Sequence, residues 1–336
     1  MKKLFVFSVS VLLSAILYAG EPFATYSFQS VSVTELEANT IAGDITLTGD
    51  ADETTTVQVF ISGNNQTAEQ IKQMLDEYYT IDIRIANGKL FAVVKQKTQF
   101  RRQRGLNISF VISAPKHVSG KMNSASGSIR LSETSGDLSF NTASGSLTVE
   151  RVSGKISGNT ASGNINLTNS ADNVSLNTAS GNVLANGCTG NIRLNTASGS
   201  VRANDLEGNI NLNTASGSVT ADDIIGSLKA GSASGRIELK NISGNLQIND
   251  NSRGNISVNM KTVDEYVIIA NNSRSINLTL PAEKGYDLNV TAESVEVSGM
   301  RGFRGEMDRK ILNGTVGSGG AKIEISKSRQ VNLTFN

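Results

Sequence analysis

The stretch that decides the fold reads Asn141-Thr142-Ala143-Ser144-Gly145-Ser146-Leu147-Thr148-Val149, and it returns with few changes from Asn159 to Leu167. Its Ala-Ser-Gly triplet occurs seven times at an unbroken spacing of 18 residues. The glycines of the triplets are Gly127, Gly145, Gly163, Gly181, Gly199, Gly217 and Gly235. Self-similarity at a fixed period is typical of repeat proteins, in which equivalent units stack on one another.

A second series of glycines falls midway between the triplets. Its members are Gly136, Gly154, Gly190, Gly208, Gly226 and Gly244. The unit is therefore nine residues long and is used twice in each 18-residue repeat. Within each unit, apolar residues stand two and four places after the glycine, as Leu147 and Val149 follow Gly145. This period of two predicts one short strand with a single apolar face.

A third inward position is expected seven residues after each glycine. In one half of the repeat it holds larger apolar residues, namely Val152, Cys188, Leu206, Ile224 and Ile242. In the other half it holds alanine, at Ala143, Ala161, Ala179, Ala197 and Ala215. We therefore expect one wide and one narrow edge, with Cys188 as a buried small hydrophobe.

One short strand cannot hide its apolar face, whereas stacked two-strand coils bury a continuous interior. The repeat thus predicts an all-β fold, a parallel β-solenoid with 18-residue coils of two short strands, paired about 4.8 Å apart. Glycine and serine are expected at the corners, because glycine reaches positive φ without a Cβ penalty.

Two polar columns run through the repeat. Asparagine recurs at Asn141, Asn159, Asn177, Asn195 and Asn213, and stacked amides of this kind can bond along the column. We interpret this ladder as a structural lock, with a ligand-binding comb as the alternative. Threonine recurs at Thr142, Thr160, Thr178, Thr196 and Thr214, and a surface row of hydroxyls there would suit ice binding.

The flanks of the repeat differ from it. Thr67-Ala68-Glu69-Gln70 resembles a capping box, and the apolar spacing that follows predicts a helix over 67–80 that caps the solenoid end. A basic stretch containing Lys95, Lys97, Arg101, Arg102 and Arg104 is interpreted as a solvated hairpin tip. The segment from Glu293 to Glu306 interrupts the strand pattern and is the candidate for a protruding loop.

The N-terminus has the pattern of a secretory signal. Lys2 and Lys3 precede an apolar run, and small residues follow it. We expect cleavage after Ala19, with a cut after Gly20 or retention as an anchor as alternatives. The predicted organisation is a signal peptide over 1–19, an N-terminal β region with the capping helix over 20–115, regular repeats over 116–260 and a less regular continuation over 261–336.

Composition narrows the function. The 31 Lys and Arg balance 30 Asp and Glu, which argues against nucleic acid and other polyanions as partners. Cys188 is alone, so no intramolecular disulfide is expected, and His117 is alone, so neither a Ser-His-Asp triad nor a histidine-rich metal site can be assembled. The repeat lacks the recurring Asp of calcium-binding nonapeptides. We expect no cofactor, no metal and no membrane span once the signal is removed.

An enzyme remains the main alternative to a binding protein. Asp205, Glu207, Asp222 and Asp223 fall at corners of successive coils, where paired carboxylates could serve a carbohydrate-active β-helix enzyme. Acidic residues at solvated turns are common, so the cluster is interpreted as turn chemistry and no catalytic residue is assigned.

Several segments carry a family resemblance. The nonapeptide series is followed by Ile276-Asn277-Leu278-Thr279-Leu280-Pro281 and by a Gly-x-Gly-Gly-x-x-Ile-x-Ile stretch from Gly317 to Ile325. Together they resemble the bacterial putative-adhesin β-helix family of unknown function, over nearly the whole chain past the signal. The resemblance implies a right-handed β-helix and an envelope location, and it brings no catalytic residues.

The sequence therefore predicts an exported, non-catalytic scaffold rather than an enzyme. Its ligand is expected to be a glycan, a cell-wall polymer or a partner protein, met through shallow multivalent contacts. The expected location of the exported protein is the periplasm, the cell surface or the medium. Self-association through strand edges at the solenoid ends is possible on this pattern.

Overall fold

The computed structural model describes residues 20–97, 105–249, 254–270 and 272–336. The predicted signal segment and Arg101, Arg102 and Arg104 lie outside these ranges. Strands make up 65 % of the residues that the structure describes, against a usual share of about 20–25 %, which confirms the all-β class. The chain divides into two compact units, residues 1–164 and residues 165–336. The predicted boundaries near 115 and 260 stay predictions.

Unit 1 contains thirteen of the described elements besides the short 3-10 turn η1 (Ser30–Ser32). They are β1 (Ala24–Gln29), β2 (Glu35–Thr40), β3 (Ile45–Thr48), β4 (Thr54–Ser62), α1 (Ala68–Tyr78), β5 (Tyr79–Ala86), β6 (Lys89–Gln96), β7 (Asn107–Ser113), β8 (Ser119–Ser124), β9 (Ile129–Ser132), β10 (Leu138–Thr142), β11 (Leu147–Glu150) and β12 (Lys155–Thr160).

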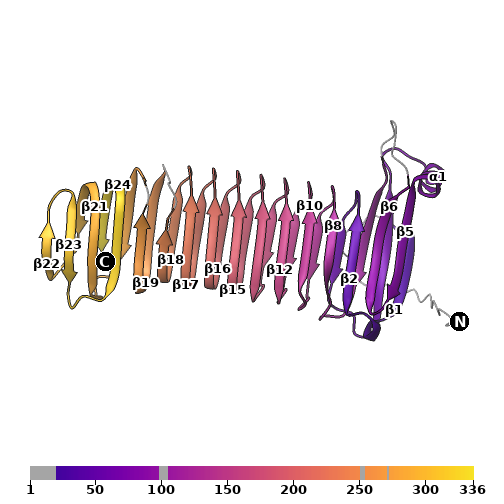
Figure 1. The fold of residues 1–336 in the computed structure, drawn as a ribbon, viewed down its shortest axis with the longest axis horizontal. Coiled ribbons are helices and arrows are strands. Elements are labelled where there is room, and N and C mark those ends of the chain that lie inside the picture. Colours follow the sequence, from indigo (N-terminus) through magenta and orange to yellow (C-terminus); the bar gives the residue numbers. More distant parts are fainter. Residues whose placement is uncertain (1–19, 98–104, 250–253, 271) are drawn as a thin grey trace. The chain divides into compact units, whose positions relative to one another are not determined.

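The strands of unit 1 form two ladders (Figure 1). In one ladder β6, β2, β8, β10 and β12 pair in parallel, and β5 closes it antiparallel to β6. In the other β7, β3, β9 and β11 pair in parallel, and β4 and β1 follow antiparallel. Leu138 pairs with Ile156, so the register within the repeats is 18 residues.

The order of strands in the stack of unit 1 differs from their order in the sequence. Asn39 pairs with Asn123 and Ile45 with Ile129, so β2 and β3 form a level directly against the first repeat. The strands β4 to β7 are then added on the far side of that level. This placement follows from the sequence, because β2 and β3 share the apolar alternation of the repeats, with Leu36 and Leu47 fully buried.

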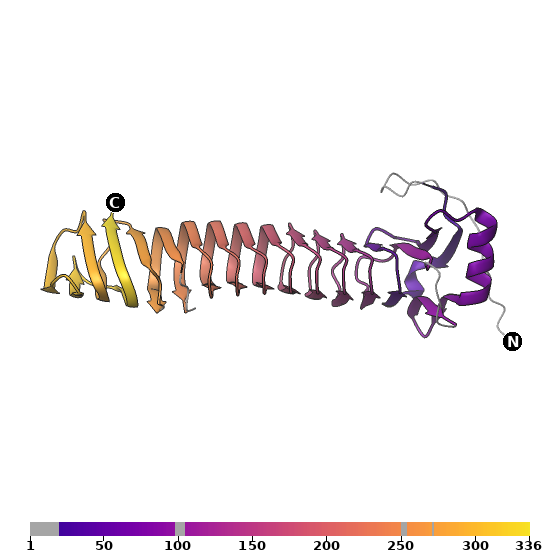
Figure 2. The same cartoon turned by 90° about the horizontal axis from the view of Figure 1, so that it is seen from above.

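The helix α1 begins where the capping box places it. The Thr67 amide donates to Gln70 Oε1 at 2.9 Å, and the Gln70 amide donates to Thr67 Oγ1 at 3.3 Å. The helix ends at Tyr78, two residues short of the prediction, and only Met74 of its residues is buried. The helix contacts β5, and Figure 2 shows it at one end of unit 1. Its role as a cap stays a prediction.

Unit 2 carries the later repeats and the C-terminal strands. Its elements are β13 (Ile165–Thr168), β14 (Asn173–Thr178), β15 (Val183–Thr196), β16 (Val201–Thr214), β17 (Val219–Ser232), β18 (Ile237–Ile248), β19 (Asn255–Ala270), β20 (Ser275–Leu280), β21 (Tyr286–Ser298), β22 (Phe303–Met307), β23 (Ile311–Val316) and β24 (Ala321–Phe335). The part of the chain that the structure describes holds no helix long and apolar enough to cross a membrane.

Parallel stacking organises unit 2 (Figure 1). Val183 pairs with Val201, Val201 with Val219 and Val219 with Ile237, again at 18-residue intervals. These residues and the matching column of the second half, such as Ile192, are almost completely buried. The register shifts between β18 and β19, and β19 and β20 then pair in parallel at a spacing of 20 residues, Asn255 with Ser275.

The C-terminal strand β24 is inserted into the stack of unit 2. It pairs in parallel with β19 and β20 on one side and with β21 on the other. The hairpin of β22 and β23 then closes the ladder antiparallel to β21. The predicted protruding loop over 293–306 is therefore wrong. That segment is the end of β21, a tight turn in which Gly299 and Gly302 have positive φ, and β22.

The narrow edge of the repeat was also predicted wrongly. The alanines expected to face inward, such as Ala197 and Ala215, are exposed, and the preceding threonines are buried instead. Thr196 is 6 % exposed and Thr214 is 4 % exposed. A buried hydroxyl is tolerated only when it is hydrogen-bonded, and backbone atoms satisfy both threonines here. The threonine row is therefore not the exposed row of hydroxyls that the ice-binding alternative requires.

Candidate functional site at the corner of the repeats

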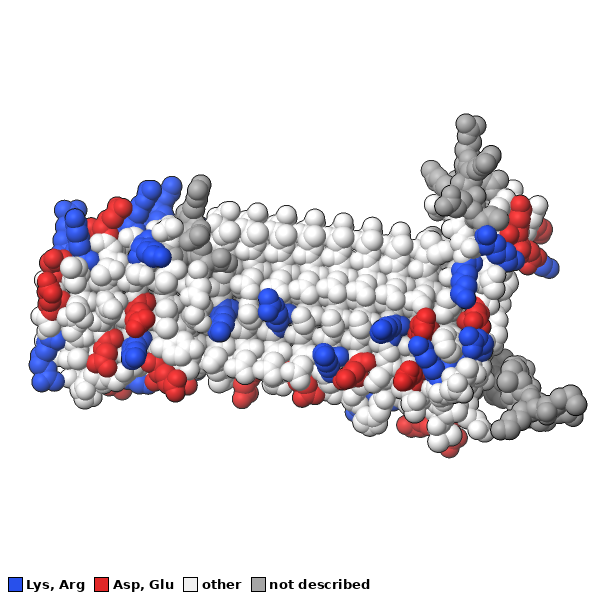
Figure 3. Space-filling model, in the orientation of Figure 1, with Lys and Arg blue, Asp and Glu red and all other residues white. Residues whose placement is uncertain are grey.

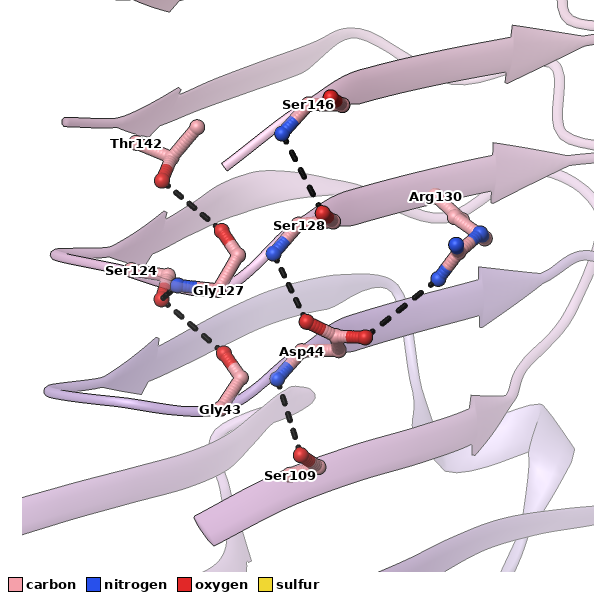
Figure 4. Close-up of polar contacts among 9 residues, drawn as sticks. All are labelled: Gly43, Asp44, Ser109, Ser124, Gly127, Ser128, Arg130, Thr142 and Ser146. Atoms are coloured by element: carbon pink, nitrogen blue, oxygen red, sulfur yellow. Dashed lines mark hydrogen bonds and ion pairs between the residues drawn. The ribbon is translucent and has the colours of Figure 1, made fainter. Parts of the chain in front are cut away.

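The exposed Ala and Ser of each triplet form the corner that we call the Ala-Ser corner. In unit 1, Thr142 Oγ1 donates to the Gly127 carbonyl oxygen at 2.8 Å and accepts from the Gly145 amide at 3.1 Å. Figure 4 shows this bond and the same arrangement one level down, where Ser124 replaces threonine and contacts Gly43 and Gly127. Each hydroxyl therefore ties its own turn to the preceding one.

The same lock recurs in unit 2. Thr214 Oγ1 donates to the Gly199 carbonyl oxygen at 2.8 Å and accepts from the Gly217 amide at 3.1 Å. Ser232 makes the two equivalent bonds to Gly217 and Gly235, both at 2.8 Å. Sequence reasoning missed this role, although the invariant hydroxyl three residues before each triplet glycine is its signal.

The triplet glycines lie at this corner for a reason other than the one expected. Their φ angles are not positive, but a Cβ on Gly217 would lie 1.9 Å from the Gly199 carbonyl oxygen. Close approach of two backbones therefore requires glycine there. Positive φ occurs instead at midway glycines such as Gly208, at +124°, and at the opposite corner, where Asp205 and Asp223 have φ near +54° and +52°.

The predicted asparagine column forms a chain of amide hydrogen bonds inside each unit. In unit 1, Asn141 Nδ2 donates to Asn123 Oδ1 at 3.1 Å, and Asn159 Nδ2 donates to Asn141 Oδ1 at 2.8 Å. In unit 2, Asn195 bonds Asn177 at 2.7 Å and Asn213 bonds Asn195 at 3.3 Å. The sequence analysis missed a second ladder of the same kind, formed by Asn173, Asn191 and Asn209.

The acidic residues weighed for catalysis lie at the opposite corner. Asp205 and Asp223 occupy equivalent exposed turns one repeat apart, in the left-handed conformation that Asp tolerates better than most residues. Asp222 Oδ1 accepts from Asn241 Nδ2 at 2.9 Å. Turn geometry accounts for these acids, and Glu207 lies exposed on the strand beyond that turn.

A charged hollow lies at the C-terminal end of the Ala-Ser corner in unit 2. We call it the basic corner groove. It has a volume of about 830 Å³ and is lined by four cations, Arg274, Lys310, Lys327 and Arg329, together with Asn272, Thr291, Ala292, Glu293 and Ser328. Figure 3 shows Lys and Arg gathered over β19 to β24, beside a row of uncharged residues. All four cationic side chains belong to exposed residues.

Backbone contacts show that the groove continues the same corner. Gly254 stacks on Gly235, since a Cβ at Gly254 would lie 2.2 Å from the Gly235 carbonyl oxygen. The Arg274 amide then donates to the Gly254 carbonyl at 3.3 Å, and the Arg329 amide donates to the Ser273 carbonyl at 3.3 Å. Arg274 and Arg329 therefore replace the small neutral residues of the triplets at two successive levels of one corner.

The floor of the groove is fixed by buried contacts. Ser273 and Ser328, 0 % and 4 % exposed, are joined through their hydroxyls at 3.1 Å. The Ala292 amide donates to the Lys310 carbonyl oxygen at 3.0 Å. Four chain segments are thus held side by side, and each of them brings polar or cationic side chains to one surface.

The positive charge of the groove is not neutralised by ion pairs. Among the described residues, the salt bridges within 4.0 Å include Lys240 with Glu238 at 2.8 Å, but none involves the four groove cations. Glu293 is the one carboxylate of the lining. The sequence analysis missed this site because it considered only the charge of the whole chain, which is balanced. A count over a shorter segment would have indicated it, because residues 301–329 hold seven Lys and Arg against three Asp and Glu.

Comparison with known proteins addresses the same part of the chain. Residues 168–330 match the model of the Toastrack DUF4097 family. This segment is a little under half of the chain, and it contains every residue of the basic corner groove. The match supports a relation of unit 2 to an uncharacterised family.

The other two comparisons add little. A solved structure described as a putative cell adhesion protein from Clostridium sporogenes has 11 % identity, covers 93 % of this chain and 98 % of its own, and has a TM-score of 0.23. At that TM-score the likeness carries no argument about fold or function. No curated protein matches the chain.

Proposed function

We propose that this protein is an exported, non-catalytic, adhesin-like scaffold that binds an envelope or extracellular polymer, or a partner protein. The basic corner groove carries the proposal. It is an open surface built from four chain segments and lined by four cations, which is an arrangement for holding a charged ligand. A glycosidase needs a pair of carboxylates, whereas this lining has one.

We propose further that the stacked strands form a right-handed β-helix with 18-residue coils, capped by α1. The parallel register of 18 residues inside each unit supports the coil length. The right-handed sense of the β-helix is what the family resemblance implies. The triplet glycines and the asparagine ladders serve this scaffold, because close backbone contact and stacked amides fix each coil on the next.

Export rests on the N-terminal signal pattern. The predicted cleavage would release a chain with a single cysteine, Cys188, which is fully buried. Burial raises the pKa of its thiol, so the protein offers no reactive thiolate in an oxidising compartment. Such a buried thiol is compatible with the oxidising conditions of the periplasm, the surface or the medium.

The experiment has two arms. In the first, cells producing the chain with a C-terminal tag are fractionated, and the tagged protein is expected in envelope or medium at the size left by cleavage near Ala19. In the second, the purified chain is sedimented with isolated envelope polymer and tested for release of reducing ends. Cytoplasmic retention of the uncleaved chain, absence of binding, or turnover that Glu293→Gln abolishes would each contradict the proposal.

A further inference from the structure

We infer that the basic corner groove binds an extended anionic polysaccharide, whose sugars carry carboxylate, sulfate or phosphate groups. The inference rests on the proposed function and specifies its ligand class. Its starting point is charge. The lining of the hollow brings four cations together with a single carboxylate, so the lining itself has a net positive charge.

The side chains suit spaced acidic groups. Arg274 and Arg329 can bind a carboxylate or phosphate through two parallel hydrogen bonds, while Lys310 and Lys327 act as compact point charges. Arg274 and Arg329 come from adjacent levels of the corner, the level of Ala292 and Glu293 follows, and Lys310 lies on the level beyond it, while Lys327 stands two residues before Arg329 in β24. Neighbouring strands in a sheet lie about 4.8 Å apart, so acidic groups repeated along a polymer can meet them in succession.

The neutral part of the lining suits sugar hydroxyls. Thr291 offers a hydroxyl as donor and acceptor, and Glu293 offers a carboxylate that accepts hydrogen bonds. A carboxylate among four cations would weaken binding of a bare inorganic anion. It is compatible with a ligand that brings both acidic groups and hydroxyl donors, which is the chemistry of an acidic sugar chain.

The shape and surroundings of the groove favour a chain over a flat surface. The hollow of about 830 Å³ falls within the usual range of ligand pockets, about 300–1,000 Å³. In unit 2 the corner continues as exposed small residues, Ala179, Ser180, Ala197, Ser198, Ala215, Ser216, Ala233 and Ser234. A polysaccharide that extends beyond the groove therefore contacts a surface of small, uncharged residues rich in hydroxyls.

The test compares two charge-matched variants in the full chain. Groove variant Arg274→Gln with Lys327→Gln and Arg329→Gln removes three cations. Control variant Arg193→Gln with Arg202→Gln and Lys229→Gln removes three exposed cations from the strand faces of β15, β16 and β17. Lys310→Gln and Lys229→Gln form a matched single pair, in case the triple variant fails to fold. Circular dichroism and thermal melting report the folding of each variant.

Binding is measured to polygalacturonate, dextran sulfate and neutral dextran. Each groove cation should contribute about fivefold, so the groove variant should bind the two anionic polymers on the order of a hundredfold more weakly, with little change in the control. Neutral dextran should not bind. Salt at about 1 M, where the Debye length is about 3 Å, should remove most of the binding.

The outcomes separate the two proposals. Equal weakening by both variants, or binding that salt does not affect, would overturn the groove assignment. Groove-dependent binding of polyglutamate, of phosphatidylglycerol vesicles or of single-stranded DNA that equals or exceeds that of the polysaccharides would overturn the ligand class. Wild-type binding to envelope polymer that the groove variant retains would sink this inference and leave the scaffold function standing. No binding of the wild type to any polymer would defeat both.

Discussion

The hydroxyl of Thr214 donates to the carbonyl oxygen of Gly199 at 2.8 Å, and it also accepts from the Gly217 amide. Thr214→Val keeps the shape but leaves two buried backbone groups without a partner. We expect a loss of about 1–3 kcal/mol in the free energy of unfolding, measured in urea. Thr214→Ser should cost less, since Ser232 makes the same bonds one repeat on. A valine variant as stable as the wild type would disprove the lock.

A Cβ at Gly217 would meet the Gly199 carbonyl oxygen at 1.9 Å, so Gly217→Ala forces the two backbones apart. We expect destabilisation of at least about 3 kcal/mol, or loss of soluble protein. Ser216→Ala, at the exposed neighbouring position, should stay within about 0.5 kcal/mol of the wild type. Gly217→Ala melting at the wild-type temperature would show that the corner relaxes easily.

Asn195 stands in the middle of the ladder in unit 2 and bonds both Asn177 and Asn213. Asn195→Ala removes both bonds, and the loss should be about 1–3 kcal/mol. Asn166→Ala, at an exposed position on β13, should change little. Polymer binding by Asn195→Ala should equal that of the wild type if the ladder is structural. A selective loss of binding without a loss of stability would favour the ligand-binding comb.

The repeat was predictable because its signals are local. Alternation with a period of two places Val201 and Ala203 inward, and an 18-residue period aligns Val201 with Val219 across strands. The helix start at Thr67 was equally predictable from its capping box. The residue that faces inward at the narrow edge was not predictable, because a small residue does not indicate whether its position is buried or exposed. Ala215 fits a tight interior as well as an exposed turn.

The ends of the stack and the groove depend on non-local pairing. Nothing within β24 indicates that Ile323 pairs with Val267 on one side and with Leu288 on the other. Both partners belong to strands that come earlier in the chain, β19 and β21. The groove follows from that insertion, which brings Arg329 beside Ser273. Sequence composition averaged these charges away over the whole chain. Only the fold shows which cations share a surface.

Tyr286 anchors β21 beside the C-terminal strand. Its hydroxyl donates to the Pro281 carbonyl oxygen at 2.8 Å, and its ring lies 5.8 Å from that of Phe335. Burial raises the pKa of its phenol from 10 to about 12, because the charged phenolate is disfavoured away from water. The side chain is fully buried, so the shift bears on stability at high pH.

The direction of the change in folding stability with pH follows from the number of protons that the folded and unfolded states bind. Below pH 10 both states keep the phenol proton, and the contribution to stability is complete. Between pH 10 and about 12 the unfolded chain has lost the proton while the folded chain keeps it, so stability falls as pH rises. Relative to Tyr286→Phe, the wild type should lose on the order of 2 kcal/mol over this window in urea titrations. Parallel curves for the two proteins would show that Tyr286 ionises as an exposed phenol does, and that the start of β21 is open to water.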